Sequence, residues 1–189
     1  MFSALEAIKQ INKLRKDSIV VSTMTPNRYW VSVSNRPELD LPIYGAMGKA
    51  SSVGLGLAIA QPDRDVIVLD GDGALLMNLG SLVTIADRAA TNLVLFVFED
   101  GVYYTTGGQS VPGSGKTDFS GLAKASGFNG NFKFDNLEDF VSELPGIFTM
   151  EGPVLVCLKV FHEIPSGVYM GSTNDAASTL SKALNPNLS

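Results

Sequence analysis

The chain has 189 residues, 45% of them hydrophobic and 17% charged, which is enough for one domain with a substantial core. Its net charge of −5 argues against nucleic-acid binding, so an anionic ligand must be held by backbone amides, a helix N-terminus or a metal ion. No apolar run reaches the ~20 residues of a membrane span, and residues 1–15 do not resemble a signal peptide, so we expect a cytoplasmic protein without membrane contact.

The first two expected elements are a helix and a buried strand. Apolar side chains between residues 2 and 14 recur at near-helical spacing and predict a helix of about four turns. Ser3 followed by Glu6 resembles a capping box at the start of this helix. The β-branched run Ser18–Ser22 then predicts a buried strand.

A segment of small apolar residues follows at Ala50–Ala60. It contains Gly54 and Gly56, and each glycine costs a helix about 1 kcal/mol. We still interpret the segment as a helix, because the two glycines are spaced for close backbone packing against a neighbouring element.

The rest of the chain alternates core strands with helices. Apolar runs predict strands at Val66–Leu69, Leu93–Phe98 and Val154–Val160, and helices at 79–89, Asp118–Ser126 and Asn136–Leu144. Asp118 and Asn136 are suitable N-caps for the last two helices. Cys157 is the only cysteine and lies in the last strand, so we expect a buried thiol and no disulfide or cysteine-ligated cluster. Apolar strands alternating with helices indicate an α/β fold, a three-layer α/β/α sandwich with a parallel sheet of about six strands.

We expect a single domain over residues 1–189, because the sequence shows no internal repeat and no obvious linker. The tail, residues 171–189, is rich in Ser, Asn and Ala and carries no recognisable chemistry. It is expected to be either a short helix or flexible.

A carboxylate-rich turn lies between a predicted strand and the next helix. The turn is Asp70-Gly71-Asp72-Gly73. Its carboxylate can reach a divalent cation, its glycines let the backbone approach a ligand, and the helix that follows offers a place for phosphate. Taken alone, such a turn is more often only a turn.

A second acidic position follows the next predicted strand. Glu99-Asp100 end this strand, and a polar loop with five glycines continues to residue 115. Because the carboxyl ends of adjacent parallel strands meet at one edge of the sheet, Asp72 and Asp100 are expected to lie close together. Two such ligands, a backbone carbonyl, two phosphate oxygens and a water would complete an octahedral Mg²⁺ site.

This pattern resembles the thiamine diphosphate motif, a GDG followed some 25–30 residues later by paired asparagines. The stretch GDGALLMNLGSLVTIADRAATNLVLFVFEDGVYYTTGGQ is similar to the small cofactor-binding part of sulfopyruvate and phosphonopyruvate decarboxylases. The resemblance covers residues 18–128. It implies thiamine diphosphate and Mg²⁺ as cofactors, and decarboxylation of sulfopyruvate to sulfoacetaldehyde and CO₂, or of phosphonopyruvate to phosphonoacetaldehyde.

The resemblance also implies residue roles. Asp72, Asp100 and the Val102 carbonyl would bind the metal. Gly45 would offer its carbonyl to the aminopyrimidine, and Met47 would be the apolar wedge that bends the cofactor. The cofactor-binding residues that it implies are Thr23, Gly45, Met47, Gly71, Gly73, Ala74 and Tyr103.

The chain departs from the family pattern in two places. Glu99-Asp100 replaces the asparagine pair and adds negative charge, so either the metal is held less well or Asp100 compensates by binding it more strongly. Lys49 stands where relatives often have histidine, and Lys49 and Arg28 are the candidate contacts for a sulfonate or phosphonate head group. His162 is interpreted as structural and receives no role.

Enzymes of this kind also need a glutamate from a separate pyrimidine-binding domain. We expect no second α/β domain in this chain, so the resemblance implies an alpha-type partner subunit that supplies the glutamate, and a chain that is inactive alone. The partner face would comprise Met24–Trp30, Gly45–Lys49 and Tyr103–Gln109. Two alternatives remain: another thiamine diphosphate enzyme, such as a carboligase or an oxidative 2-oxoacid enzyme, or a non-catalytic cofactor-binding subunit.

Overall fold

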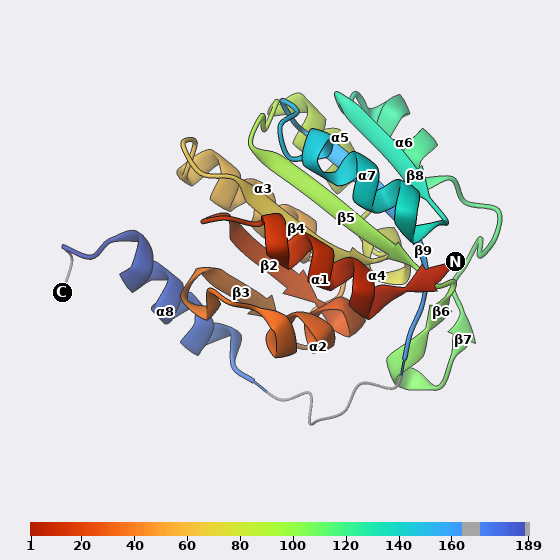
Figure 1. Cartoon of the computed structure of the whole chain (residues 1–189), viewed down its shortest axis with the longest axis horizontal. Coiled ribbons are helices and arrows are strands. Elements are labelled where there is room, and N and C mark those ends of the chain that lie inside the picture. Colours follow the sequence, from red (N-terminus) through yellow and green to blue (C-terminus); the bar gives the residue numbers. More distant parts are fainter. Residues whose placement is uncertain (164–170, 188–189) are drawn as a thin grey trace.

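A parallel β-sheet forms the centre of the structure (Figure 1), a computed structural model that describes residues 1–163 and 171–187. The strands are β1 (Phe2–Ser3), β2 (Ile19–Thr23), β3 (Asp40–Ile43), β4 (Val66–Gly71), β5 (Leu93–Glu99), β6 (Val102–Tyr103), β7 (Gln109–Ser110), β8 (Gly130–Phe134) and β9 (Val154–Phe161). The helices are α1 (Ala4–Leu14), α2 (Met24–Val33), α3 (Ala50–Ala60), α4 (Asp72–Leu76), α5 (Ser81–Asp87), α6 (Phe119–Ser126), α7 (Leu137–Ile147) and α8 (Thr173–Leu184), with 3-10 turns η1 (Pro37–Leu39) and η2 (Tyr104–Thr106).

Within the described residues the main sheet has seven strands in the order β1-β9-β5-β4-β2-β3, and β8 also pairs with β9. Every pairing in this sheet is parallel. In the register of β4 and β5, Gly71 lies opposite Phe98. The two strands therefore end side by side, which brings the residues that follow them to the same edge of the sheet.

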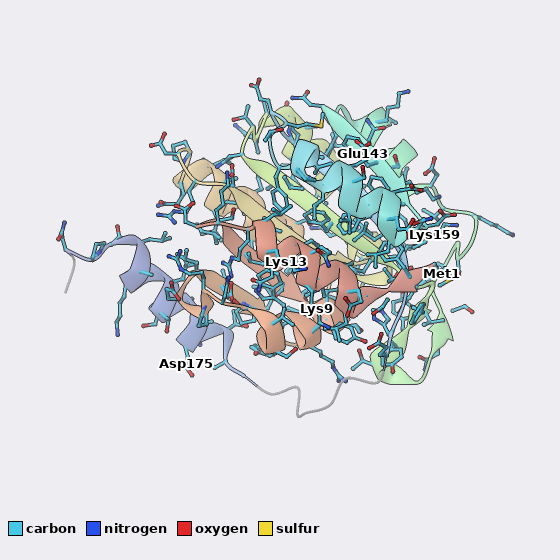
Figure 2. All side chains as sticks on the ribbon, in the orientation of Figure 1. Met1, Lys9, Lys13, Glu143, Lys159 and Asp175 are labelled. Atoms are coloured by element: carbon cyan, nitrogen blue, oxygen red, sulfur yellow. The ribbon has the colours of Figure 1, made fainter. Side chains whose placement is uncertain are left out.

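Two separate cores cover the two faces of the sheet, because alternate strand residues point in opposite directions. Val66 and Val68 pack with α3, α5 and α6, whereas Ile67 and Leu69 pack with α1, α2 and α7. Figure 1 shows α1 and α7 crossing the near face of the sheet. In Figure 2, Lys9 and Lys13 are exposed on α1. The three-layer α/β/α prediction is confirmed.

The local predictions succeeded where the apolar pattern was strong. Ser3 is the N-cap of α1 and accepts a hydrogen bond from the Glu6 amide, at 3.2 Å. The first helix is shorter than expected, because Phe2 and Ser3 pair with β9 as strand β1. The predicted helix at 79–89 is also too long: α5 ends at Asp87, and Ala89 has a φ of +46°, which a helix does not allow.

Asn136 caps α7 as predicted, accepting from the Glu138 amide at 2.7 Å, whereas Asp118 precedes α6 without a side-chain cap bond. Strands β3 and β8 were not predicted. Pro42 interrupts the short run of β3, and β8 is only partly buried, so neither has the continuous apolar pattern of the central strands.

Within the described part of the tail, residues 171–187, helix α8 covers Thr173–Leu184. Helix α8 packs against β3, and its Leu180 is buried in the core. Thr173 anchors its start by donating to the Pro42 carbonyl at 3.0 Å and accepting from the Tyr44 amide at 3.0 Å. None of the helices within residues 1–163 and 171–187 is long and apolar enough to cross a membrane.

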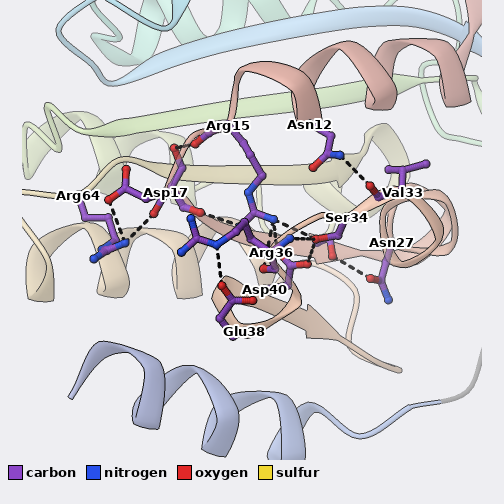
Figure 3. Close-up of polar contacts among 12 residues, drawn as sticks. Asn12, Arg15, Asp17, Asn27, Val33, Ser34, Arg36, Glu38, Asp40 and Arg64 are labelled. Carbon is purple, nitrogen blue, oxygen red and sulfur yellow. Dashed lines mark hydrogen bonds and ion pairs between the residues drawn. The ribbon is translucent and has the colours of Figure 1, made fainter. Parts of the chain in front are cut away.

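A buried ion pair joins the end of α1 to β3 (Figure 3). Arg15 Nη1 donates to Asp40 Oδ1 at 2.7 Å, and the two side chains are 1% and 10% exposed. Ser34 donates to the other oxygen of Asp40, and the guanidinium lies 5.1 Å from the centre of the Trp30 ring. Burial is the main influence that raises the pKa of Asp40, and the charge of Arg15 opposes it. This cluster fixes β3, and so the segment after it, relative to the rest of the sheet.

The two glycines of α3 differ in their surroundings. A β-carbon on Gly54 would lie 2.3 Å from Val68 Cγ2, whereas a β-carbon on Gly56 would meet nothing within 4 Å. Close packing is therefore the reason for Gly54 only, and the same interpretation of Gly56 is wrong.

Gly54→Ala is expected to lower the free energy of unfolding by about 1–3 kcal/mol, because the methyl group pushes α3 away from β4. Gly56→Ala is the matched control, and alanine at this exposed helical position should raise stability by about 0.5–1 kcal/mol. Urea denaturation of both variants measures the difference. Equal effects of the two substitutions would contradict the assigned contact.

Candidate active site

A cavity of about 310 Å³ opens at the carboxyl ends of the central strands. This is where ligands bind in open parallel sheets. Its volume is at the lower end of the ~300–1,000 Å³ of ligand sites. It is lined by Met24, Thr25, Pro26, Gly45, Met47, Gly71, Asp72, Gly73, Ala74, Phe98, Asp100, Val102, Tyr103, Tyr104, Thr105, Thr106 and His162.

The structure brings most of the predicted site residues to this cavity. Lining positions are occupied by Gly45, Met47, Gly71, Asp72, Gly73, Ala74, Asp100, Val102 and Tyr103. Three predicted residues do not line it. Thr23 is fully buried and its hydroxyl donates to the Ile43 carbonyl at 3.2 Å, Lys49 is exposed just before α3, and Arg28 lies on α2.

Asp72 is the more deeply buried of the two carboxylates among the predicted metal ligands. Its side chain accepts hydrogen bonds from the Gly73 amide at 2.7 Å and the Gly101 amide at 2.9 Å. Burial raises the pKa of Asp72 to about 6, and the nearby charge of Asp100 adds to this. A divalent cation would favour the charged form of such a carboxylate.

Asp70 lies two residues before Asp72 and is completely buried. One of its oxygens accepts from the Gly71 amide at 2.9 Å, and the other has no hydrogen-bond partner. Burial raises the pKa of Asp70 to about 7. Its position behind the turn makes it a support of the Gly71–Gly73 backbone.

Asp100 follows β5 and lies close to the only histidine of the chain. Asp100 Oδ1 accepts from the Val102 amide at 3.1 Å, and Oδ2 lies 2.8 Å from His162 Nε2. The side chains of His162 and Asp100 are 3% and 9% exposed. Sequence reasoning gave His162 no role, and no local pattern could have linked it to a residue 62 positions earlier.

Glu99 also replaces an asparagine of the motif, but it does not line the cavity. Its side chain is 9% exposed and accepts a hydrogen bond from Cys157 Sγ at 3.1 Å. Burial, together with this bond to Glu99, raises the pKa of the Cys157 thiol, so the thiol is the buried core group that was predicted. Of the pair Glu99-Asp100, only Asp100 therefore lines the cavity.

The turn between β3 and α3 presents Met47 to the cavity. Gly45 and Gly48 both have a φ of +70°, a backbone conformation that glycine adopts at low cost. Asn78 secures the turn by donating to the Gly48 carbonyl at 3.1 Å. Met24, across the cavity, has a φ of +49°, which is uncommon for a residue with a β-carbon and often marks a functional site.

The β6–β7 hairpin covers the third side of the cavity. A β-carbon on Gly73 would lie 2.5 Å from Tyr103 Cε1, so the tyrosine ring packs directly on the GDG turn. Tyr104 and the two residues after it continue the lining from η2. The two tyrosines thus add partly buried aromatic rings to this side of the cavity.

The donor atoms suit a hard cation that shares its coordination with a phosphorylated ligand. Asp72, Asp100 and the Val102 carbonyl offer oxygen ligands of the type that Mg²⁺ prefers. Among residues 1–163 and 171–187, no group of three or more His, Cys, Asp or Glu side chains is placed to hold a metal. A metal here would need oxygens from a bound ligand, as the diphosphate of a cofactor supplies.

Fold and cavity together define a cofactor-binding α/β domain, and comparison with known proteins gives its family. Residues 19–158 match the family model for the C-terminal TPP-binding domain of thiamine pyrophosphate enzymes. The chain belongs to this family of thiamine diphosphate-binding domains.

Several similar proteins are named as decarboxylases. The chain is 38% identical to the sulfopyruvate decarboxylase subunit beta of Methanothermobacter thermautotrophicus over 85% of this chain and 83% of that protein. It is 37% identical to the phosphonopyruvate decarboxylase of Streptomyces viridochromogenes over 84% of this chain but only 39% of that protein. A solved structure from Mycobacterium smegmatis, described as a candidate thiamin diphosphate-dependent enzyme, is similar with a TM-score of 0.72 and 17% identity. The match covers 86% of this chain and 32% of that chain, and it supports the fold alone.

Proposed function

We propose that this chain is the thiamine diphosphate- and Mg²⁺-binding subunit of a sulfopyruvate or phosphonopyruvate decarboxylase. The observation that carries the proposal is the meeting of two turns, 25 residues apart, at one cavity: Met47 from the first and Asp72 from the second. The 38% identity to a sulfopyruvate decarboxylase beta subunit over most of both chains supports the substrate class.

The residues of the cavity would divide the work of holding the cofactor. Asp72, Asp100 and the Val102 carbonyl would bind the metal that carries the diphosphate. Gly45 and Met47 would orient the aminopyrimidine, with Met47 as a flexible apolar support for two rings. When bound, thiamine diphosphate supplies the nucleophilic carbon and takes up the electrons released as CO₂ leaves.

The protein would add desolvation and backbone contacts. Met24, Phe98 and Tyr103 give the cavity apolar walls, which would limit the access of water to a bound cofactor. The Gly73 amide would contact the diphosphate, and in the structure it donates to Asp72 Oδ1. If Asp72 binds the metal, its hydrogen bond with the Gly73 amide would weaken and the amide could donate to the diphosphate. Metal binding by Asp72 and diphosphate binding by Gly73 would therefore be linked.

A partner subunit would complete the site. None of the described residues that line the cavity is a glutamate, although the chemistry requires one at the pyrimidine ring. The beta-subunit relatives support an alpha-type partner that supplies it.

The surface expected to contact the partner is smaller than the sequence suggested, because Tyr29 and Trp30 are 3% and 0% exposed and belong to the core. Gly45–Lys49 and Tyr103–Gln109 remain, together with Met24–Arg28, in which Met24 and Arg28 are partly exposed.

Substrate choice tests the proposal. The assembled enzyme should turn over sulfopyruvate or phosphonopyruvate with a kcat/KM at least about 10-fold above that for pyruvate, because charge-assisted contacts to the acidic head group are worth ~1.5–3 kcal/mol each. Lys49→Ala, two residues after Met47 in the turn before α3, should reduce this preference, and Lys116→Ala, an exposed lysine in a different loop, is the control. Equal or better turnover of pyruvate would rule the substrate class out.

A further inference from the structure

His162 is held in place at the edge of the cavity by contacts of its ring with two tyrosines. It stacks on Tyr29, with ring centres 5.7 Å apart and planes 16° apart, and its ring centre lies 5.3 Å from that of Tyr104. The next residue is also anchored: Tyr29 donates to the Glu163 carbonyl, and Ser3 donates to the Glu163 carboxylate at 2.7 Å. The imidazole therefore has a fixed position rather than a range of surface rotamers.

This fixed imidazole meets the one cavity residue at which the chain departs from the thiamine diphosphate motif. Asp100 stands where that motif has asparagine, and His162 Nε2 is 2.8 Å from its Oδ2. An asparagine amide carries both a donor and an acceptor, whereas a carboxylate carries acceptors only. Asp100 is thus held by donors from elsewhere, the Val102 amide on Oδ1 and the imidazole on Oδ2.

We propose that His162 is a positioning residue that orients Asp100 toward the cofactor metal, and that the His162–Asp100 pair takes the place of the motif's asparagine. The metal role of Asp100 rests on the proposed function, whereas the pairing itself rests on the structure. Pairing of β5 with β9 explains why the two residues meet: Glu99 lies opposite Lys159, so the ends of both strands reach the same edge.

The proposal predicts that the two residues are energetically coupled. With aspartate at position 100, loss of the imidazole leaves the carboxylate with one donor and free to turn away from the metal. After Asp100→Asn, the side chain brings its own amide, and the imidazole should no longer matter. A residue that only packs against Tyr29 and Tyr104 would show the same effect in both backgrounds.

Calorimetric titration of the full 189-residue chain with Mg²⁺ and thiamine diphosphate tests the coupling. His162→Phe keeps an aromatic ring in contact with Tyr29 and Tyr104 but removes the donor, and should weaken binding about 10-fold or more. His162→Gln keeps a donor and should recover most of this loss. In the Asp100→Asn background, His162→Phe should change binding by no more than about 2-fold. Equal losses in the two backgrounds would overturn the proposal.

A second measurement does not depend on the cofactor. Because the chain contains a single histidine, its ring nitrogen signals in NMR belong to His162 without further assignment. Asp100→Asn should shift the Nε2 signal, and Asp87→Asn, an exposed control, should not. If the chain failed to bind Mg²⁺ and thiamine diphosphate at all, the proposed function would fall and this arm would still decide the pairing. Ring signals unmoved by Asp100→Asn would refute it.

Discussion

Asp72→Ala is expected to abolish Mg²⁺-dependent binding of thiamine diphosphate, with affinity falling by at least about 100-fold. The substitution removes a charged metal ligand. Asp72 is only 3% exposed, so water cannot easily take the place of the lost carboxylate. Calorimetry with and without Mg²⁺ measures the effect directly. Asp87→Ala, a 75% exposed side chain on α5, should bind as the parent chain does.

A folding control separates loss of a ligand from loss of structure. Burial raises the pKa of Asp72 to about 6, above its ordinary value of 3.8, so its contribution to metal-free stability is complete below pH 3.8 and is lost as the pH rises through about 6. Asp72→Asn should therefore remain at least as stable as the parent at pH 7, while binding is lost. Unchanged cofactor affinity in a folded Asp72 variant would refute the metal role.

Asp100→Asn should behave differently from the Asp72 variants. It restores the residue of the motif and removes one negative charge beside Asp72, so binding should be retained or improved. The same titration compares the two positions. A loss as large as that of Asp72→Ala would show that the carboxylate charge of Asp100 is essential.

The second large effect is the inactivity of the chain by itself. With saturating Mg²⁺ and thiamine diphosphate, the purified chain should show no measurable 2-oxoacid decarboxylation, compared with ~1–10³ s⁻¹ for ordinary enzymes. No described residue that lines the cavity is a glutamate, so the chain does not supply the group that the pyrimidine ring needs. Thr105 and Thr106 are exposed, so this side of the cavity is open to solvent. Without a partner, the pyrimidine end of the cofactor would remain in water.

Addition of an alpha-type subunit should restore turnover. Hydrogen exchange gives a second readout, since the Tyr103–Gln109 segment should exchange more slowly once the partner covers it, while the central strand β5 should not change. Turnover at ordinary rates by the isolated chain would refute the partner requirement. Recovery only with the second subunit would support it.

Local sequence patterns were sufficient for the central architecture. The runs at Val66–Leu69, Leu93–Phe98 and Val154–Val160 are apolar on both faces, and only strands covered by helices on both sides need that pattern. The motif spacing also placed Asp72 and Asp100 together, because consecutive parallel strands end at the same edge. Short or half-exposed elements such as β3 and β8 lacked a comparable signal.

Sequence by itself therefore determined the α/β class, the parallel strands and the acidic pair that follows them, since each depends on residues close together in the chain. Only the tertiary structure decided which glycine of α3 is needed for packing, that Glu99 turns away to Cys157, and that His162 reaches Asp100. Those contacts depend on the register between β5 and β9 and on the packing of α3 on β4. Long-range register is set by the whole core, so no local pattern encodes it.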